Sequence, residues 1–201
     1  MNYQIHSLFP TPIYQSSLSF KFEEKHFRQV DKLKRIKNNH NSFSENTHVL
    51  NLPIFSKLKK DIQKHLDNYL EAVHSPRDNI KLQITQSWLN WTEDSESHHA
   101  HAHQNSFVSG VFYIQSEQED KIFFSKDKYT AFKIDPKEYN IFNAESWWFP
   151  AQENSLVLFP SSTVHDVKTR KGKRTRISLA FNTFIKGNLG NHEYSLHELC
   201  L

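Results

Sequence analysis

The chain has 201 residues, a length that suits one domain with a sizeable core and is short for two. Only 37% of the residues are hydrophobic, but 16 Phe, 7 Tyr and 4 Trp supply large apolar side chains, which argues against disorder. The net charge of +3 is too small to indicate a nucleic-acid or membrane surface, no apolar run is as long as a membrane span, and the one cysteine excludes an internal disulfide. We therefore expect a cytoplasmic protein.

The first predicted feature is an extended arm over residues 1–19. Pro10 and Pro12 keep this segment out of the interior of a sheet, so we expect it to lie along a sheet edge. Apolar residues then recur at a three-residue spacing among polar ones from Phe22 to about Lys37. This spacing places one apolar stripe on a helix and predicts the first helix of the chain.

A loop rich in Asn and Ser follows over residues 38–46. Apolar residues then recur every four positions from Ile54 to Val73, which predicts an amphipathic helix ending near Pro76. Residues 1–76 are therefore expected to form an arm and two supporting helices.

After residue 76 the sequence changes to short aromatic and β-branched runs separated by polar stretches, which is typical of a β-sandwich or barrel. These runs are residues 80–91, 107–115, 121–124, 130–134, 147–149, 155–159, 165–168 and 174–184. Such strands suit a double-sheet jelly roll, with the two helices packed on one sheet. We expect one domain, mainly β with N-terminal helices (α+β), in which residues 77–186 form the jelly-roll core and residues 187–201 a tail.

Histidine is concentrated in the segment His98-His99-Ala100-His101-Ala102-His103. In an extended strand, residues two apart face the same side, so His99, His101 and His103 would project together while His98 points away. Neutral imidazole is the commonest protein ligand of transition metals. A solvated histidine-rich loop explains the same pattern, so a metal site requires support from elsewhere in the chain.

A second segment gives that support. His165 begins a predicted strand, and Arg176 and Ser178 lie two apart on the next one, facing the same side. An arginine fork can hold a carboxylate through two hydrogen bonds, and a neighbouring hydroxyl can donate a third. A strand, a tight turn and a returning strand would bring this pair beside the metal. Asp166 would face the opposite side and is not expected to be a ligand.

Together these residues resemble the Fe(II)/2-oxoglutarate-dependent oxygenases and, more narrowly, a small branch of that superfamily from marine bacteria and their phages. The resemblance covers most of the chain. It is carried by Leu8-Phe9-Pro10-Thr11-Pro12-Ile13, Ser87-Trp88-Leu89-Asn90, His101-Ala102-His103, Ser109-Gly110-Val111-Phe112-Tyr113, Phe159-Pro160, His165 and Arg176-Ile177-Ser178-Leu179-Ala180-Phe181-Asn182.

The resemblance implies a double-stranded β-helix that holds Fe(II) between its sheets and uses 2-oxoglutarate as cosubstrate. It implies His101 and His165 as iron ligands, and Arg176 with Ser178 as partners of the far carboxylate of 2-oxoglutarate. Two further residues are candidates for contacts with the cosubstrate, Asn90 and Tyr113.

The implied activity is that of a dioxygenase. Decarboxylation of 2-oxoglutarate by O2 would be coupled to oxidation of a substrate, with hydroxylation as the default outcome. The sequence does not identify this substrate, and a small molecule or a peptide is expected rather than a nucleic acid or a membrane. It leaves a homodimer open as the assembly.

One position departs from the superfamily pattern, which has Asp or Glu two residues after the first histidine. Here that position is His103. We favour His103 as a third ligand, but it could instead leave that position to water or contact the substrate. Weaker alternatives use His99 with His101, or Glu96 with His98.

Two other functions remain open at this point. One is a cupin-like three-histidine metalloenzyme that needs no 2-oxoglutarate, and the other is a non-catalytic metal-binding β-sandwich module.

Three features outside this constellation complete the predictions. The basic turn over residues 168–174 is expected to be a solvated hairpin tip. Trp147 and Trp148 have two possible interpretations, as part of a lid over the site or as part of the core. The histidines outside the two segments, among them His26 and His192, are expected to be exposed.

Overall fold

The computed structural model describes residues 1–77, 79–126, 132–190 and 197–201. The elements up to residue 76 are β1 (Tyr14–Ser17), α1 (Glu24–Asp31), β2 (Arg35–Lys37), β3 (Ser42–Ser44), the short 3₁₀ helices η1 (Val49–Asn51) and η2 (Pro53–Phe55), and α2 (Ser56–His74). The later strands are β4 (Lys81–Thr92), β5 (His98–His101), β6 (Val108–Gln115), β7 (Lys121–Ser125), β8 (Ser146–Pro150), β9 (Ser155–Pro160), β10 (His165–Val167), β11 (Arg176–Lys186), β12 (Asn188–Leu189) and β13 (Leu199–Cys200).

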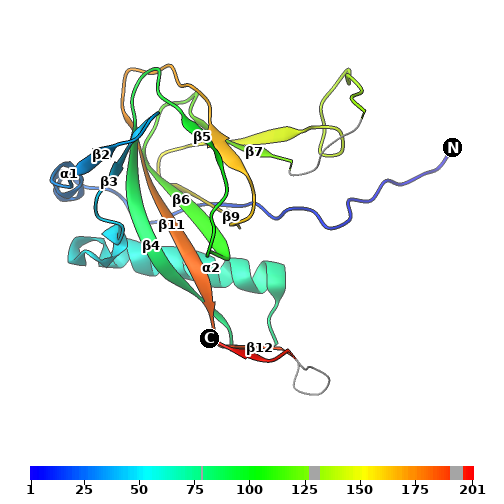
Figure 1. Cartoon of the computed structure of the whole chain (residues 1–201), viewed down its shortest axis with the longest axis horizontal. Helices are drawn as coiled ribbons and strands as arrows, with labels where there is room; N and C mark the ends of the chain where they lie inside the picture. The colour runs from blue at the N-terminus through cyan, green and yellow to red at the C-terminus, as the bar shows by residue number, and fades with distance from the viewer. Residues whose placement is uncertain (78, 127–131, 191–196) are drawn as a thin grey trace.

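The strands form two main antiparallel sheets. One has seven strands in the order β1-β9-β6-β11-β4-β3-β2, and the other has four in the order β5-β10-β7-β8. Figure 1 shows α2 lying across the seven-stranded sheet, with β5 and β7 in a separate layer. The predicted fold, a mainly β jelly roll with two N-terminal helices, is confirmed. Among the described residues, no helix is both long and apolar enough to cross a membrane.

Alternating side chains give the seven-stranded sheet two different faces. On β11, Leu179 and Phe181 belong to a large apolar core that includes the buried face of α2, whereas Arg176 and Ser178 line a cavity on the opposite face. A smaller apolar cluster around Phe159 lies on that cavity side. The period-two pattern of the strands thus separates an apolar layer beneath the helices from a polar layer between the sheets.

The second helix agrees with its prediction. Leu58, Ile62 and Leu66 are fully buried, at the four-residue spacing read from the sequence. The helix ends where Ser75 adopts a left-handed conformation with φ of 41° and donates its N–H to carbonyls of the last turn. Pro76 follows and cannot continue the helix.

The first helix is shorter than predicted. It ends at Asp31, and β2 pairs with β3 to extend the sheet beside β4. Ile36 continues the apolar spacing but is 37% exposed, because β2 is an edge strand. The guanidinium of Arg35 lies 4.4 Å from the ring centroid of Trp91, a contact that favours the strand over a further helical turn.

The N-terminal arm lies at a sheet edge as predicted, since β1 pairs with β9 and Tyr14 stands opposite Leu158. Within the predicted strand 130–134, residues 130 and 131 lie outside the described residues, and residues 132–134 form no strand.

The expectation that the remaining histidines are exposed is wrong for His26. Its side chain is buried against Phe20 and Phe22. His192 lies outside the described residues.

Candidate metal centre

Two histidines of one segment, His101 and His103, converge between the two sheets with His165, which is distant in the sequence. The pairing of β5 with β10 places His101 opposite His165, and the N–H of His103 donates to the carbonyl of Ser161 at 2.9 Å. The ligand nitrogens of the three imidazoles all lie within 4.8 Å of one another. His103 Nε2 and His165 Nε2 are 3.3 Å apart. Two ligands at about 2.1 Å from one ion would be about 3.0 to 3.4 Å apart, so this spacing suits a shared metal.

Two of these imidazoles are oriented by backbone carbonyls. His101 Nδ1 lies 2.8 Å from the carbonyl oxygen of His99, and His165 Nδ1 lies 3.0 Å from that of Thr163. In the neutral ring, Nδ1 donates to the carbonyl and Nε2 keeps its lone pair for a metal. The third ring, His103, is hydrogen-bonded by Asn182 and stacked on Trp88.

Burial keeps the three histidines neutral, which is the form that binds metals. Burial is the main cause that lowers the pKa of His165 to about 3 and the pKa of His103 to about 4, and the neighbouring His101 contributes to both shifts. The pKa of His101 is lowered by burial too, with an opposing contribution from Asp166.

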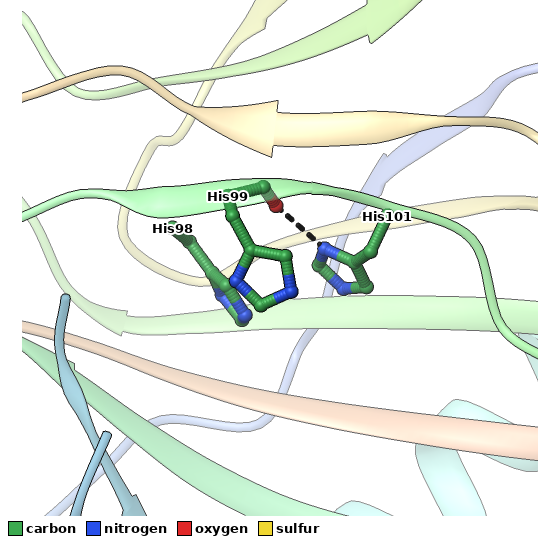
Figure 2. A group of neighbouring side chains, drawn as sticks. All are labelled: His98, His99 and His101. Atoms are coloured by element: carbon green, nitrogen blue, oxygen red, sulfur yellow. Dashed lines mark hydrogen bonds between the residues drawn. The ribbon is translucent and has the colours of Figure 1, made fainter. Parts of the chain in front are cut away.

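The expectation that His98 points away from the other histidines is wrong. Its ring stacks on that of His101 with 4.5 Å between centroids, and His98, His99 and His101 form a second group with closely spaced ligand nitrogens (Figure 2). The alternation fails because the pairing of β5 with β10 is irregular between His165 and Val167.

Neither Glu96, which was an alternative ligand, nor Asp166, which was not expected to be one, lies in a metal-capable group of the described residues. Glu96 contacts Lys37 through Oε1 and accepts the N–H of Glu93 through Oε2, so it is engaged elsewhere. Asp166 is buried, lines the same cavity as His165 and pairs with Lys168.

The residues predicted to hold a carboxylate lie in one row across the seven-stranded sheet. Ser178 on β11 stands opposite Asn90 on β4 and opposite Tyr113 on β6. Arg176 begins β11, and its guanidinium carbon lies 5.1 Å from the ring centroid of Tyr113.

Arg176 is a buried cation without an acidic partner. Only 3% of the residue is exposed, Nη1 donates to the carbonyl of Lys121 at 3.1 Å, and no ion pair of Arg176 occurs among the described residues. The buried hydroxyl of Tyr113 has no partner of good hydrogen-bond geometry there either, although the guanidinium of Arg176 lies close enough to interact with it. Burial raises the pKa of this hydroxyl, and the charge of Arg176 opposes the shift. A buried charge without an acidic partner, beside such a hydroxyl, indicates a site for an anionic ligand.

The sequence suggested that His165 and Arg176 are neighbours on one hairpin, and this expectation is wrong. β10 belongs to the four-stranded sheet and β11 to the seven-stranded sheet, so the two residues face each other across the cavity. This inner cavity of about 40 Å³ is lined by the three histidines together with Asn90, Arg176 and Ser178. An outer cavity of about 310 Å³ shares His98, His101 and His103 with the inner one, but not His165, and is lined further by Asn41, Phe43 and Gln104.

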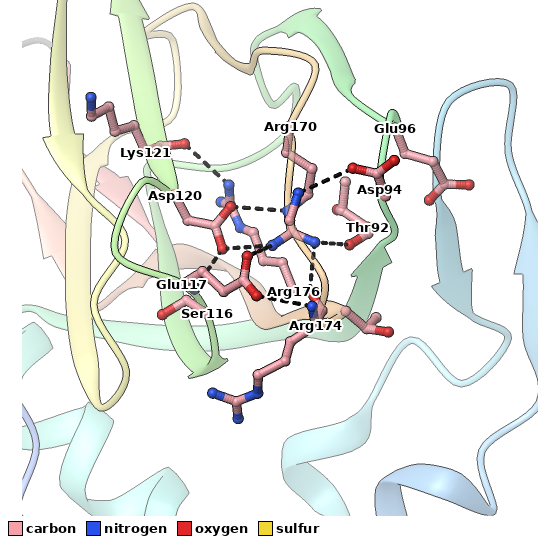
Figure 3. A network of polar contacts seen from close by, with 12 residues as sticks. Thr92, Asp94, Glu96, Ser116, Glu117, Asp120, Lys121, Arg170, Arg174 and Arg176 are labelled. Carbon is pink, nitrogen blue, oxygen red and sulfur yellow. Dashed lines mark hydrogen bonds and ion pairs between the residues drawn. The ribbon is translucent and has the colours of Figure 1, made fainter.

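The basic turn is not simply a solvated tip, because Arg170 is buried. Its Nε and Nη2 donate to the two carboxylate oxygens of Asp120 at 3.0 and 3.2 Å, and Nη1 donates to the carbonyls of Thr92 and Arg174 (Figure 3). Asp120 immediately precedes Lys121, which receives the hydrogen bond from Arg176. The ion pair therefore fixes both the turn that leads into β11 and the segment that orients Arg176.

Sequence reasoning gave no role to Asn182 or to the ion pair of Arg170 with Asp120. Asn182 could have been found, because it continues the period-two series of Arg176 and Ser178 along β11. The partner of Arg170 depends on tertiary contacts that leave no local signal.

Trp147 and Trp148 fit neither of their two interpretations. They are 44% and 47% exposed, which excludes the core, and they line neither the inner nor the outer cavity. They lie instead beside a separate surface cavity of about 840 Å³.

Comparison with known proteins gives a family match over part of the chain. Residues 86–182, nearly half of it, match a family described as "Putative 2OG-Fe(II) oxygenase". The matched segment runs from β4 to β11 and contains all three converging histidines and Arg176. Among curated proteins, none matches this sequence.

Solved structures resemble the chain in fold. HygX from Streptomyces hygroscopicus, with nickel, 2-oxoglutarate and hygromycin B bound, has a TM-score of 0.60 at 12% identity, covering 86% of this chain and 82% of its own. A 2OG-Fe(II) oxygenase family protein from Burkholderia pseudomallei has a TM-score of 0.55 at 13% identity, with 84% and 83% covered. A prolyl-4-hydroxylase from Pseudomonas putida has a TM-score of 0.54 at 11% identity, with 86% and 92% covered. At these identities the likeness establishes the fold alone.

Proposed function

We propose, from the match of residues 86–182 to the 2OG-Fe(II) oxygenases, that this chain binds Fe(II) and 2-oxoglutarate and oxidises a substrate, with hydroxylation as the default outcome. One observation carries the proposal. Arg176 is a buried cation without an acidic partner among the described residues, and it lines the same cavity as His101, His103 and His165. A dianionic cosubstrate that also chelates a metal could pair one carboxylate with Arg176 and bind, through its other end, a metal held by the three histidines.

The histidine group fits a divalent iron centre. His101, His103 and His165 would hold the ion through one face of its coordination shell, leaving the remaining positions for exchangeable ligands. The carbonyls of His99 and Thr163 fix two of the rings, so that little reorientation is needed on binding. His103 takes the place of the carboxylate usual in the superfamily. A neutral imidazole in place of a carboxylate would raise the net charge of the centre by one.

Arg176 fits the far carboxylate of 2-oxoglutarate. The guanidinium can donate two parallel hydrogen bonds, while the hydroxyl of Ser178 lies two residues further along β11 and that of Tyr113 lies opposite it on β6. The amide of Asn90 is available on the opposite side of Ser178. Each of these side chains is buried, so a bound carboxylate would exchange water for several directed donors.

When bound, Fe(II) and 2-oxoglutarate supply O2 activation through decarboxylation to succinate and CO2. The chain contributes orientation and exclusion of water. Phe159 and Val157 close the cavity side of the large sheet, and Phe124 packs against Phe159 from the smaller sheet. The outer cavity, which shares His101 and His103 with the inner one, is the entry we assign to the substrate.

Several finer expectations remain predictions. They are a small-molecule or peptide substrate, a homodimer, and a relationship to the marine bacterial and phage branch of the superfamily.

The test is an anaerobic titration of the purified chain with Fe(II) and 2-oxoglutarate, followed by visible absorption. We expect a charge-transfer band that His165→Ala abolishes and Arg176→Ala weakens. Arg174→Ala is the matched control, because Arg174 lies in the same turn but is exposed.

Two results would refute the proposal. If Fe(II) binds but 2-oxoglutarate changes neither its spectrum nor its affinity, the chain is a three-histidine metalloenzyme of another kind. If Fe(II) does not bind at all, the histidines serve no iron chemistry.

A further inference from the structure

The segment that carries the proposed iron ligands contains a second metal-capable group. His98, His99 and His101 present ligand nitrogens that all lie within 4.8 Å of one another. Figure 2 shows the three rings gathered on one side of β5. Their centroids are 4.5 Å apart for His98 and His101, and 5.2 Å apart for each pair with His99.

We propose that His98, His99 and His101 form an outer binding site for a divalent transition metal such as Zn²⁺ or Ni²⁺, and that this outer site competes with the inner one for His101. Three imidazoles and a water complete the tetrahedral shell that Zn²⁺ prefers. The outer site stands on its own geometry, whereas its competition with iron rests on the proposed function.

A buried amide beside His98 supports the site. Asn41 is 1% exposed, its Oδ1 has no hydrogen-bond partner among the described residues, and its Nδ2 lies 3.5 Å from His98 Nδ1. Rotating the amide by 180° would bring Oδ1 to the imidazole, where it could accept a hydrogen bond from Nδ1–H. His98 Nε2 would then be free to bind a metal, and the orphaned oxygen would gain its partner. Metal ligands are commonly oriented by an acceptor of this kind.

The two sites exclude each other because they share one atom. His101 Nδ1 is engaged with the carbonyl of His99, so Nε2 is the one nitrogen that this ring can offer to either ion. His99 is exposed, whereas His165 is only 6% exposed. An ion arriving from solvent therefore meets the outer site first and, while it stays there, withholds a ligand from the inner site.

The outer site can be isolated by removing an inner ligand. In the His165→Ala variant of the full chain, we expect Zn²⁺ to bind with one equivalent per chain in a calorimetric titration. Adding His99→Ala should weaken that binding by roughly tenfold or more, because a ligand is lost while the carbonyl that orients His101 is kept. Adding His103→Ala instead should leave it unchanged. Adding Asn41→Leu should weaken it without removing any ligand.

Circular dichroism melting of each variant would show whether the chain remains folded, and His40→Ala, at an exposed histidine, controls for nonspecific binding. The outer site is refuted if His165→Ala binds no Zn²⁺ at micromolar concentration, or if adding His99→Ala changes nothing.

The competition is tested separately in the unmodified chain, which should bind one equivalent of Zn²⁺ rather than two. Two equivalents would show that the sites do not share His101. Neither measurement involves 2-oxoglutarate, so their outcomes are independent of the charge-transfer test.

Discussion

His103 Nε2 and His165 Nε2 lie 3.3 Å apart, although one residue follows β5 and the other begins β10. This approach is the structural basis for our proposal that His103 is a metal ligand. We expect His103→Ala to weaken Fe(II) binding by roughly 10- to 100-fold, and His103→Asp to retain most of it. Iron affinity measured by competition with a chelator would check this. Unchanged affinity in His103→Ala would leave His103 as a neighbour of the metal only.

Tyr113 is expected to bind the cosubstrate through a hydroxyl that has no partner of good hydrogen-bond geometry within the described structure. Tyr113→Phe should raise the Kd for 2-oxoglutarate by roughly three- to tenfold, the effect of one hydrogen bond, without lowering the melting temperature. Tyr69→Phe is the matched control, because its hydroxyl is likewise buried without a partner but lies on α2. If both variants bind 2-oxoglutarate like the unmodified chain, Tyr113 has no role in the site.

Asp120 is expected to be essential for stability. Asp120→Asn would remove the closer of the two carboxylates that pair with the buried guanidinium of Arg170, the other being that of Glu117 with Oε2 3.5 Å from Nη2. We expect a cost of about 1.5 to 3 kcal/mol in the free energy of unfolding. Urea denaturation would measure the loss. Glu119→Gln, at an adjacent exposed carboxylate, should cost almost nothing. Equal stability of the two variants would mean that this ion pair does not hold the turn.

Gly110 lies where two neighbouring strands leave no space for a side chain. A Cβ at this position would come within 2.2 Å of the Phe181 ring and 2.7 Å of Leu158 Cδ2. Gly110→Ala should therefore destabilise the chain by about 1 to 3 kcal/mol. Combining it with Phe181→Leu should cost less than the sum of the single changes, because the smaller side chain makes room. Strict additivity in thermal unfolding would contradict this packing argument.

His26 should make the chain less stable in mild acid. Burial, reinforced by Lys25 and opposed by Glu23, lowers its pKa below the ordinary value of 6.5. The folded state thus favours the neutral ring, so its contribution is complete above pH 6.5 and is lost as the pH falls below that value. His26→Gln keeps an acceptor for the N–H of Glu23 but does not titrate, so its melting temperature should fall less between pH 7 and pH 5. Parallel pH profiles would show that His26 is not responsible.

The sequence predicted those elements whose side-chain pattern continues regularly over many residues. α2 shows its four-residue spacing over five turns, and β4, β6, β9 and β11 are strands of six or more residues with several aromatic or aliphatic side chains each. The strands β2, β3 and β5 were missed because they are short and polar, and their pairing comes from neighbours rather than from their own residues.

The sequence indicated which residues come together at the candidate site, but it did not indicate how they are arranged in space. The three histidines and Arg176 could be selected by residue type, because metal ligands and carboxylate partners are chemically restricted. Their placement on opposing sheets, and the turn of His98 toward His101, depend on sheet topology and on an irregular register that no local pattern encodes.

One face of the seven-stranded sheet contributes to stability, and the other lines the cavity. Side chains that point toward α2 supply most of the buried apolar area, while their neighbours on the same strands line the cavity. Residues that line the cavity can therefore be substituted while the apolar layer under the helices keeps the chain folded. A mutant library confined to Trp88 on β4 and Ala180 on β11 would change the lining of the cavity while Asn90, Arg176, Ser178 and the scaffold stay as they are.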